Sequence, residues 1–300
     1  MKQSLFILLF LSAITLLSCR KNRNEQDIKQ FDQSQILNYI SANGLTGMKP
    51  AGDTTGIYYQ VLQQGTGKAL DYPDTLSYVF TIKSFDNKFI QSDTIANHFF
   101  GYLGHVNPNG LMLGIHNLLK NKGSSVRLLI PSHLAFGVNG TGSGSKTITT
   151  GRIAGNQCLD YYIHVIDRQD LYDDLVIRNY MKANNLTGYI KADSGYYYKV
   201  ITPGNGVNPI QYYSTITTTY TGQFLNGTYF DQTYQTTSTT LQVNGLVSGV
   251  KDALERYATG GTSISILVPS RLGYGQAGVS GSIPGGACLR FEFQITGVAN

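Results

Sequence analysis

Apolar residues near the start of the chain follow the spacing of a helix, and the same spacing returns in the second half. The i, i+3, i+4 pattern is typical of a helix that buries one apolar face. Its members are Ile36, Tyr39 and Ile40 in the first half and Ile177, Tyr180 and Met181 in the second. A glycine-containing turn follows each set, so we expect one helix that ends at such a turn in each half.

Strand patterns follow each of these predicted helices. Residues 58–61 and 197–200 are rich in tyrosine, and each stretch leads into a Gly-x-Gly sequence. Residues 215–224 are rich in Thr, Tyr and Ile, which favour strands. Asn226-Gly227, shortly after this stretch, is a pair typical of a hairpin turn. We therefore expect antiparallel strands on either side of it.

A second, shorter helix is predicted later in each half. Its apolar markers are Val247, Val250 and Leu254, which we match with Met112, Ile115 and Leu119. A strand over residues 263–268 and a glycine-rich loop come next. The closing strand alternates the apolar side chains Leu289, Phe291, Phe293 and Ile295. Each half is therefore expected to belong to the α+β class, with a mostly antiparallel sheet and one short helix available to cover a face.

The two halves share enough ordered sequence to be copies of one domain. Residues 38–47, NYISANGLTG, recur as residues 179–188, NYMKANNLTG. Further on, Ile-Pro-Ser at 130–132 corresponds to Val-Pro-Ser at 268–270. An order-preserving internal repeat of this kind predicts a tandem architecture. We expect a first domain over residues 31–167 and a second over residues 168–300.

The first 30 residues are typical of an export and anchoring segment. Lys2 and the apolar run over residues 5–17 predict a signal peptide at 1–18, because the run is too short for a comfortable membrane-spanning helix. The ending Leu16-Leu17-Ser18-Cys19 resembles a bacterial lipobox, so we expect Cys19 to be lipidated and residues 19–30 to form a tether. The alternative is an ordinary signal peptide with an incidental cysteine. The expected location is the bacterial cell envelope, facing the periplasm.

Charge and composition argue against several classes of function. Charged residues make up only 14% of the chain, and the formal net charge of +5 is thinly spread. Nucleic-acid binding needs a basic stripe in a folded region, whereas the visible basic cluster, Arg20, Lys21 and Arg23, lies beside the predicted anchor. None of the five histidines stands at metal-ligand spacing. We therefore expect no nucleic-acid partner, no metal and no cofactor.

Two further cysteines, Cys158 and Cys288, stand in matching contexts. Each precedes a leucine and an alternating aromatic strand. A disulfide needs Cα atoms within a few ångströms of each other, and equivalent positions in two separate domains do not easily approach so closely. We expect both cysteines to be buried free thiols.

Five short motifs follow one another in the second copy. In chain order they are Thr219-Tyr220-Thr221-Gly222, Asn226-Gly227-Thr228-Tyr229-Phe230-Asp231, Leu246-Val247-x-Gly249, Val268-Pro269-x-x-x-Gly273-Tyr274-Gly275 and Ile283-Pro284-x-x-Ala287-x-Leu289-x-Phe291. Together, over residues 212–298, they resemble the FKBP family of peptidyl-prolyl isomerases. The resemblance implies two tandem FKBP-like domains, each a twisted antiparallel sheet wrapped around a short helix. It also implies a shallow apolar pocket and peptidyl-prolyl cis-trans isomerase activity.

The resemblance implies which residues form the site. Those implied to act in catalysis are Tyr220, Phe230, Asp231, Tyr274 and Phe291, and those implied to bind substrate are Leu241, Leu246, Val247, Val250 and Ile283. In this scheme Tyr274 donates its hydroxyl to a substrate carbonyl, while Asp231 polarises the pocket edge and holds Tyr220. From the residues alone, Phe291 could instead be a core residue of its strand, and Asp231 could cap a turn.

Departures from the family pattern bear on activity. The family usually has a tryptophan on the pocket floor, whereas this chain has none and Val250 takes the place. In the first copy, Phe80 and Phe136 replace the two tyrosines, and Ile90 stands where the aspartate is expected. A copy that keeps its apolar residues and loses its polar ones is expected to be structural or peptide-binding, and not catalytic.

These observations predict a prolyl isomerase that assists the folding of exported proteins, with its activity in the second copy. Its partners would be proline-containing or unfolded polypeptides, with the membrane contacted through the N-terminal lipid. Two alternatives stay open. One is a non-catalytic, chaperone-like lipoprotein that binds peptides, and the other is a structural subunit of an envelope complex.

Overall fold

The computed structural model describes residues 27–95, 97–142, 151–233 and 237–300. The predicted signal peptide, Cys19 and most of the predicted tether lie outside the described residues. The end of the tether was predicted wrongly, because helix α2 (Ile28–Ala42) begins three residues before the expected start of the first domain. Among the described helices, none combines the length and the apolar character needed to cross a bilayer.

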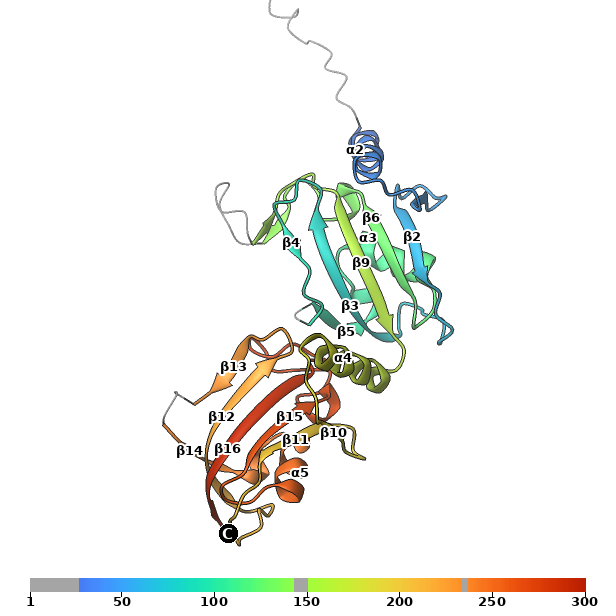
Figure 1. The fold of residues 1–300 in the computed structure, drawn as a ribbon. Coiled ribbons are helices and arrows are strands. Elements are labelled where there is room, and N and C mark those ends of the chain that lie inside the picture. Colours follow the sequence, from blue (N-terminus) through green and yellow to red (C-terminus); the bar gives the residue numbers. More distant parts are fainter. Residues whose placement is uncertain (1–26, 96, 143–150, 234–236) are drawn as a thin grey trace, which may run out of the picture.

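Within the described residues the chain forms two seven-stranded antiparallel sheets, one in each copy (Figure 1). In the first sheet the order is β1-β2-β6-β9-β3-β4, with β5 also paired to β3. Its strands are β1 (Lys49–Pro50), β2 (Tyr58–Gln63), β3 (Thr75–Ser84), β4 (Ile90–Gln91), β5 (His98–Tyr102), β6 (Ser125–Ile130) and β9 (Leu159–Ile166). A separate two-stranded ribbon pairs β7 (Thr141–Gly142) with β8 (Arg152–Ile153).

The second sheet repeats this order as β10-β11-β15-β16-β12-β13, with β14 also paired to β12. Its strands are β10 (Ile190–Lys191), β11 (Tyr197–Thr202), β12 (Thr215–Phe224), β13 (Tyr229–Gln232), β14 (Thr239–Gln242), β15 (Ser263–Val268) and β16 (Leu289–Ala299). The α+β class and the antiparallel sheets are confirmed. The predicted strands over 215–224 and 263–268 have those bounds in the structure.

Each copy has one helix at its N-terminus and one that covers a face of its sheet. The N-terminal helices are α2 and α4 (Gln169–Ala183), and the covering helices are α3 (Asn109–Gly114) and α5 (Ser248–Tyr257). In the first copy a π-helical turn at Ile115–Leu119 continues α3. The apolar face of α5 buries Val250, Ala253 and Leu254 against the sheet. Each buried Val or Leu side chain contributes roughly 1.5–3 kcal/mol, so this face fixes the helix on the sheet.

The correspondence between the two covering helices differs from the predicted one. Gly110 and Gly249 hold equivalent places. Gly110 faces Ile130 and Gly249 faces Val268, and each of these two residues is followed by Pro-Ser. A β-carbon on either glycine would lie 2.4 or 2.9 Å from that neighbour's side chain. Ile115 therefore corresponds to Leu254, and its predicted match with Val250 was wrong by about one helical turn.

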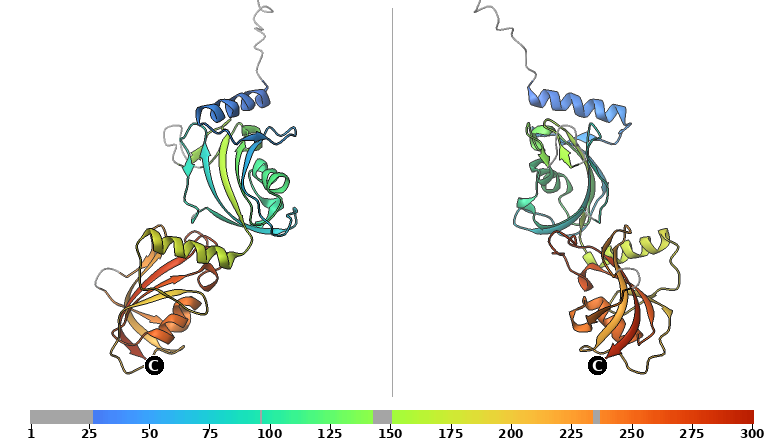
Figure 2. Two further views of the ribbon diagram at one scale, coloured as in Figure 1. Left: turned by 45° about the vertical axis from the view of Figure 1, so that its right-hand side comes forward. Right: turned by 90° about the vertical axis from the view of Figure 1, so that its left-hand side faces the viewer.

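Helix α4 lies at the junction of the two copies. It covers one end of the second sheet and faces the first sheet across the junction, whereas α2 lies at the far end of the first sheet (Figures 1 and 2). Ile177 on α4 is fully buried in a cluster with Tyr197, Leu225 and Cys288. Cys158 and Cys288 are both buried and free, as predicted.

Candidate functional site

A pocket of about 190 Å³ lies between the second sheet and α5. Its walls come from β12, β13, β14 and β16, from the start of α5 and from the loop after β15. The lining residues are Tyr220, Asp231, Leu241, Gly245, Leu246, Val247, Val250, Tyr274, Phe291 and Phe293. The floor of the pocket is apolar, and the titratable side chains that line the pocket are two tyrosines and one aspartate.

Eight of the ten site residues predicted from the sequence line this one pocket. The other two, Phe230 and Ile283, are not among its lining residues. The ring of Phe230 packs edge-on against that of Phe291, with centroids 5.7 Å apart. Ile283 is a buried core residue whose amide donates to the carbonyl of Val279. Phe230 therefore supports Phe291 from the side, whereas Ile283 belongs to the core of the second copy.

Two lining residues, Gly245 and Phe293, were not predicted as site residues. Phe293 is 97% buried, yet its ring also forms part of the pocket wall. It stacks on Tyr220 at 5.6 Å between ring centroids. Strand alternation could have indicated this position, because Phe291 and Phe293 lie on the same face of β16. Gly245, in the turn before α5, carries no comparable sequence signal.

Tyr220 and Asp231 form a direct hydrogen bond at the pocket edge. The phenol of Tyr220 donates to Oδ2 of Asp231 at 2.6 Å. Burial and the neighbouring carboxylate raise the pKa of Tyr220 well above its usual value. The phenol therefore stays protonated at neutral pH and holds the carboxylate in one orientation.

Tyr274 lies at the pocket rim, in a loop that begins with a 3-10 turn at Ser270–Leu272. Its side chain is 37% exposed, so the phenol is accessible to a bound peptide. Burial, and then the charge of Asp231, raise the pKa of Tyr274, which keeps this phenol a donor as well. The hydroxyl of Ser248 on α5 donates to the carbonyl of Leu272 at 3.1 Å, which ties the loop to the pocket floor.

The first copy has different residues at the polar positions. Phe80 and Phe136 carry no hydroxyl, as the sequence showed. Strand pairing places Gln91 opposite Ile82, as Asp231 lies opposite Gly222 in the second copy. The predicted counterpart of the aspartate, Ile90, was therefore wrong by one residue. The outcome for chemistry is the same, because no carboxylate stands at that position.

The described part of the chain offers no group of three or more His, Cys, Asp or Glu side chains placed to hold a metal ion. The chemistry available at the pocket is therefore that of an apolar cup with two neutral phenol donors and one carboxylate. Such a site can bind a small apolar ring and donate a hydrogen bond at its edge.

Comparisons with known proteins include a family match that falls on this segment. The FKBP-type peptidyl-prolyl cis-trans isomerase family matches residues 207–296. Peptidyl-prolyl cis-trans isomerase FKBP9 of Rattus norvegicus is 27% identical over 249 residues, which cover 81% of this chain and 38% of the rat protein. The outer membrane protein MIP of Legionella longbeachae is 33% identical over 121 residues, which cover 40% of this chain and 51% of that protein.

Among solved structures, FkpA from Escherichia coli superposes with a TM-score of 0.38 at 26% identity, over 43% of this chain and 61% of that one. The chain spans about half or less of the length of the curated relatives named above. The family match covers the strands, the helix and the loop that build the pocket. The segment that forms this pocket in the second copy is thus the segment that matches the FKBP-type peptidyl-prolyl cis-trans isomerase family.

Proposed function

We propose that the second copy is a peptidyl-prolyl cis-trans isomerase that assists the folding of exported proteins. The observation that supports this most directly is the pocket itself, where Tyr220, Asp231 and Tyr274 stand around an apolar floor. The activity named for the matched family and for FKBP9 points the same way. The substrate class is polypeptide with an X-Pro bond.

The chemistry needs no covalent intermediate. Rotation about an X-Pro bond is slow because amide resonance gives a barrier of roughly 18–20 kcal/mol. The twisted amide has lost that resonance, and its carbonyl depends less on water than the planar form does. A dry apolar pocket therefore favours the twisted form over the planar one. The Tyr274 phenol donates to a substrate carbonyl at the rim, and the bonded Tyr220 and Asp231 pair keeps the polar edge of the pocket in one arrangement.

We assign the first copy a non-catalytic role in the same protein. Its Phe80, Phe136 and Gln91 offer neither phenol nor carboxylate at the corresponding positions. A second function for the whole chain, peptide binding without catalysis, is favoured by one specific observation. Val250 lines the pocket floor at the place where the family usually has a tryptophan, which leaves a wider floor.

The location that we propose for the protein rests on the signal-like segment and Cys19. We propose that Cys19 carries lipid, that the mature protein begins there, and that it faces the periplasm. Lipid chains add membrane affinity with every buried CH₂ group, and stable anchoring takes more than one chain. Mass spectrometry of the N-terminal peptide of the exported protein tests this: an acylated Cys19 supports the anchor, and an unmodified cysteine at the mature N-terminus excludes it.

The decisive experiment for catalysis uses the full chain and a short proline-containing peptide. The double variant Asp231→Val with Tyr274→Phe removes the polar edge and keeps the apolar floor, so we expect kcat/KM to fall at least about tenfold. Tyr213→Phe, at a tyrosine that is 80% exposed in the same copy, is the matched control and should behave as wild type. No acceleration over buffer by the wild-type chain would exclude an isomerase and favour peptide binding without catalysis.

A further inference from the structure

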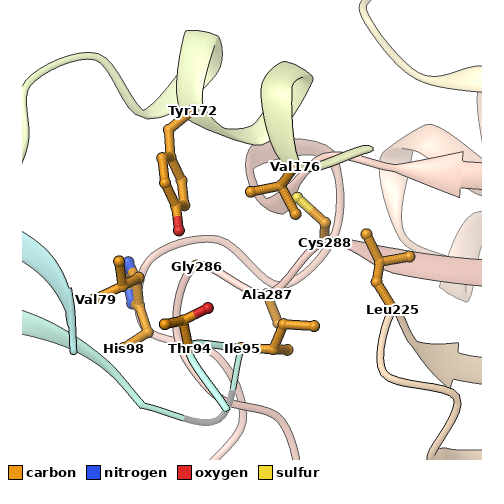
Figure 3. Close-up of a pocket in the computed structure, with 10 residues that line it drawn as sticks. All are labelled: Val79, Thr94, Ile95, His98, Tyr172, Val176, Leu225, Gly286, Ala287 and Cys288. Atoms are coloured by element: carbon orange, nitrogen blue, oxygen red, sulfur yellow. The ribbon is translucent and has the colours of Figure 1, made fainter. Parts of the chain in front are cut away.

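A segment of the first copy lies against the second copy at two places that carry its pocket. Asn226, in the hairpin turn before Phe230 and Asp231, donates from its amide to Oδ2 of Asp93 at 2.6 Å. Ile95 packs into the cluster formed around α4 and this hairpin. Figure 3 shows Tyr172 pointing from α4 toward the first copy's side of the junction. A small cavity of about 30 Å³ lies at this junction, between Val79 and His98 of the first copy and Tyr172 and Val176 of α4.

A directed chain of hydrogen bonds crosses this junction. His98 Nε2 lies 2.8 Å from the hydroxyl of Ser77, and that hydroxyl donates to Oε1 of Gln169 at 3.1 Å. The amide of Gln169 in turn donates to Oδ1 of Asp173 at 2.8 Å. The directions are determined, because a carboxylate only accepts and a hydroxyl has one proton. Ser77 must therefore accept from His98, which carries its proton on Nε2.

The chain of bonds ends on the loop that holds Tyr274. Asp173 is fully buried, and its Oδ2 accepts from the amide of Ser270 at 2.8 Å and from the hydroxyl of Ser270 at 2.6 Å. The carbonyl of Ser270 then accepts from the amide of Gly275 at 2.8 Å. Ser270, which begins the turn before Tyr274, is thus bound directly to the carboxylate of Asp173, and Gly275, directly after Tyr274, is bound to Ser270.

His98 also contacts the far end of this loop. Gly286 packs so closely on the imidazole that a β-carbon there would lie 2.4 Å from Cε1 of His98. Gly286 has φ +72°, a left-handed conformation that suits glycine. Its amide donates to the carbonyl of Gly275 at 2.9 Å. The loop over residues 270–286, which we call the Tyr274 loop, is therefore held at both ends by contacts that lead to His98.

The first copy shows what the second would be without this connection. Asp32 on α2 is equally buried and accepts from Ser132 and His133, so the anchor of helix to loop is present there too. At the position of Gln169, however, α2 has Ile28, which cannot continue a chain of hydrogen bonds. Both copies therefore have a buried aspartate that ties the first helix to the loop. The hydrogen bonds that continue across the junction through Gln169 are found at the second site and have no counterpart at Ile28.

We propose that the first copy positions the active site of the second, with His98, Ser77 and Gln169 as positioning residues that hold the Tyr274 loop. This inference rests on the proposed isomerase function for its effect on rate, but its structural content is independent of that function. The first copy, which has neither a phenol nor a carboxylate at the corresponding pocket positions, then contributes to catalysis by fixing the donor that its partner domain uses.

The test removes one hydroxyl at the middle of the connection in the full chain. Ser77→Ala breaks the link, Ser77→Thr keeps a hydroxyl, and Ser84→Ala is the matched control, because Ser84 is a buried, hydrogen-bonded serine on the same strand β3. The first measurement is hydrogen exchange of the Tyr274 loop. We expect Ser77→Ala to speed exchange of the loop amides about tenfold and Ser77→Thr to restore protection.

The second measurement is turnover of the proline peptide. We expect kcat/KM to fall about three- to tenfold in Ser77→Ala and to stay at the wild-type value in Ser84→Ala. Loop exchange and turnover equal to those of Ser84→Ala would overturn the proposal. If the wild-type chain shows no turnover, the proposed function fails, and loop exchange alone decides the positioning role. Should Ser77→Ala not fold, Gln169→Met at a half-buried position provides the same test.

Discussion

The two copies share a sheet order and a buried anchor, but they differ at every polar position of the pocket. In the second copy Tyr220 is bonded to Asp231 and Tyr274 stands at the rim. The corresponding residues of the first copy are Phe80, Gln91 and Phe136. Because the apolar core is kept in both, these polar groups are not needed for the fold. Their retention in one copy alone points to a role in chemistry.

A second difference lies in the helices that begin each copy. Gln169 on α4 connects its carboxylate anchor to the neighbouring domain, whereas Ile28 on α2 connects to nothing polar. The duplication thus produced two equivalent helices. Within the described residues, α4 has a domain on both sides, whereas α2 lies beside one domain (Figure 2). The two copies have the same fold. The Tyr274 loop of the second copy is contacted by the first copy because α4 lies between the two domains.

The largest expected effect comes from removing the buried aspartate that ties the first helix of each copy to its loop. Asp173→Ala leaves the amide and hydroxyl of Ser270 and the amide of Gln169 without their partner, and we expect a loss of about 3 kcal/mol in the free energy of unfolding. Asp32→Ala should cost a similar amount in the first copy, because Asp32 also accepts from Ser132 and His133, and from the thiol of Cys158. Denaturant unfolding measured on each full-length variant checks both values.

Activity separates the two anchor variants. Under conditions where each is still folded, Asp173→Ala should lose most of its turnover of a proline peptide, because the Tyr274 loop loses its tie to α4. Asp32→Ala should keep the wild-type kcat/KM. Equal losses of turnover in both variants would mean that the copies do not differ in the way argued above.

A smaller effect is expected from the protonation of His98. Burial lowers the pKa of this imidazole from 6.5 to about 4. Between these values the unfolded chain binds a proton that the folded chain does not, so stability falls as the pH falls from 7.5 to 4.5. Since part of the ring stays exposed, we expect His98 to account for about 2 kcal/mol of this loss.

The contribution of His98 is isolated by a difference. His98→Gln keeps a donor toward Ser77 but does not titrate, so its free energy of unfolding should fall less steeply with decreasing pH than that of wild type. Carboxylates elsewhere lose stabilising charge over the same range, and they cancel in the comparison. Parallel curves for wild type and His98→Gln would show that the imidazole is not desolvated at the junction.

The local sequence pattern predicted the helices and strands better than it predicted which residues of the two copies correspond. The strand over 215–224 was predicted to the residue because its Thr, Tyr and Ile end at a turn pair. The match of Ile115 with Val250 failed because helical periodicity is satisfied about equally one turn away. The match of Ile90 with Asp231 failed because pairing shifts at a bulge after Gly222.

The contacts across the junction could not have been predicted in the same way. His98, Ser77 and Gln169 are scattered along the chain and belong to no motif, and they meet because α4 packs on both sheets. A hydrogen-bond chain of this kind depends on tertiary placement alone. The pocket, in contrast, is built from residues whose motifs resemble a known family, so eight of its members could be listed in advance.

The smallest expected effect concerns the wall behind the Tyr220 and Asp231 pair. A β-carbon on Gly222 would lie 2.7 Å from Cζ of Phe230, whereas the first copy carries the larger Ile82 at this position. Gly222→Ala should push the Phe230 ring aside, lower the free energy of unfolding by about 1 kcal/mol and reduce kcat/KM about threefold.

Gly297→Ala is the control for this change. Gly297 lies on β16 opposite Thr217 of β12, and its β-carbon would lie 3.5 Å from Thr217, which is an ordinary contact. If Gly222→Ala is as stable and as active as Gly297→Ala, then the Phe230 ring does not brace the wall. The second copy would then owe its activity to the polar edge alone. A loss of activity with Gly222→Ala would mean that the chemistry needs both the edge and the aromatic packing behind it.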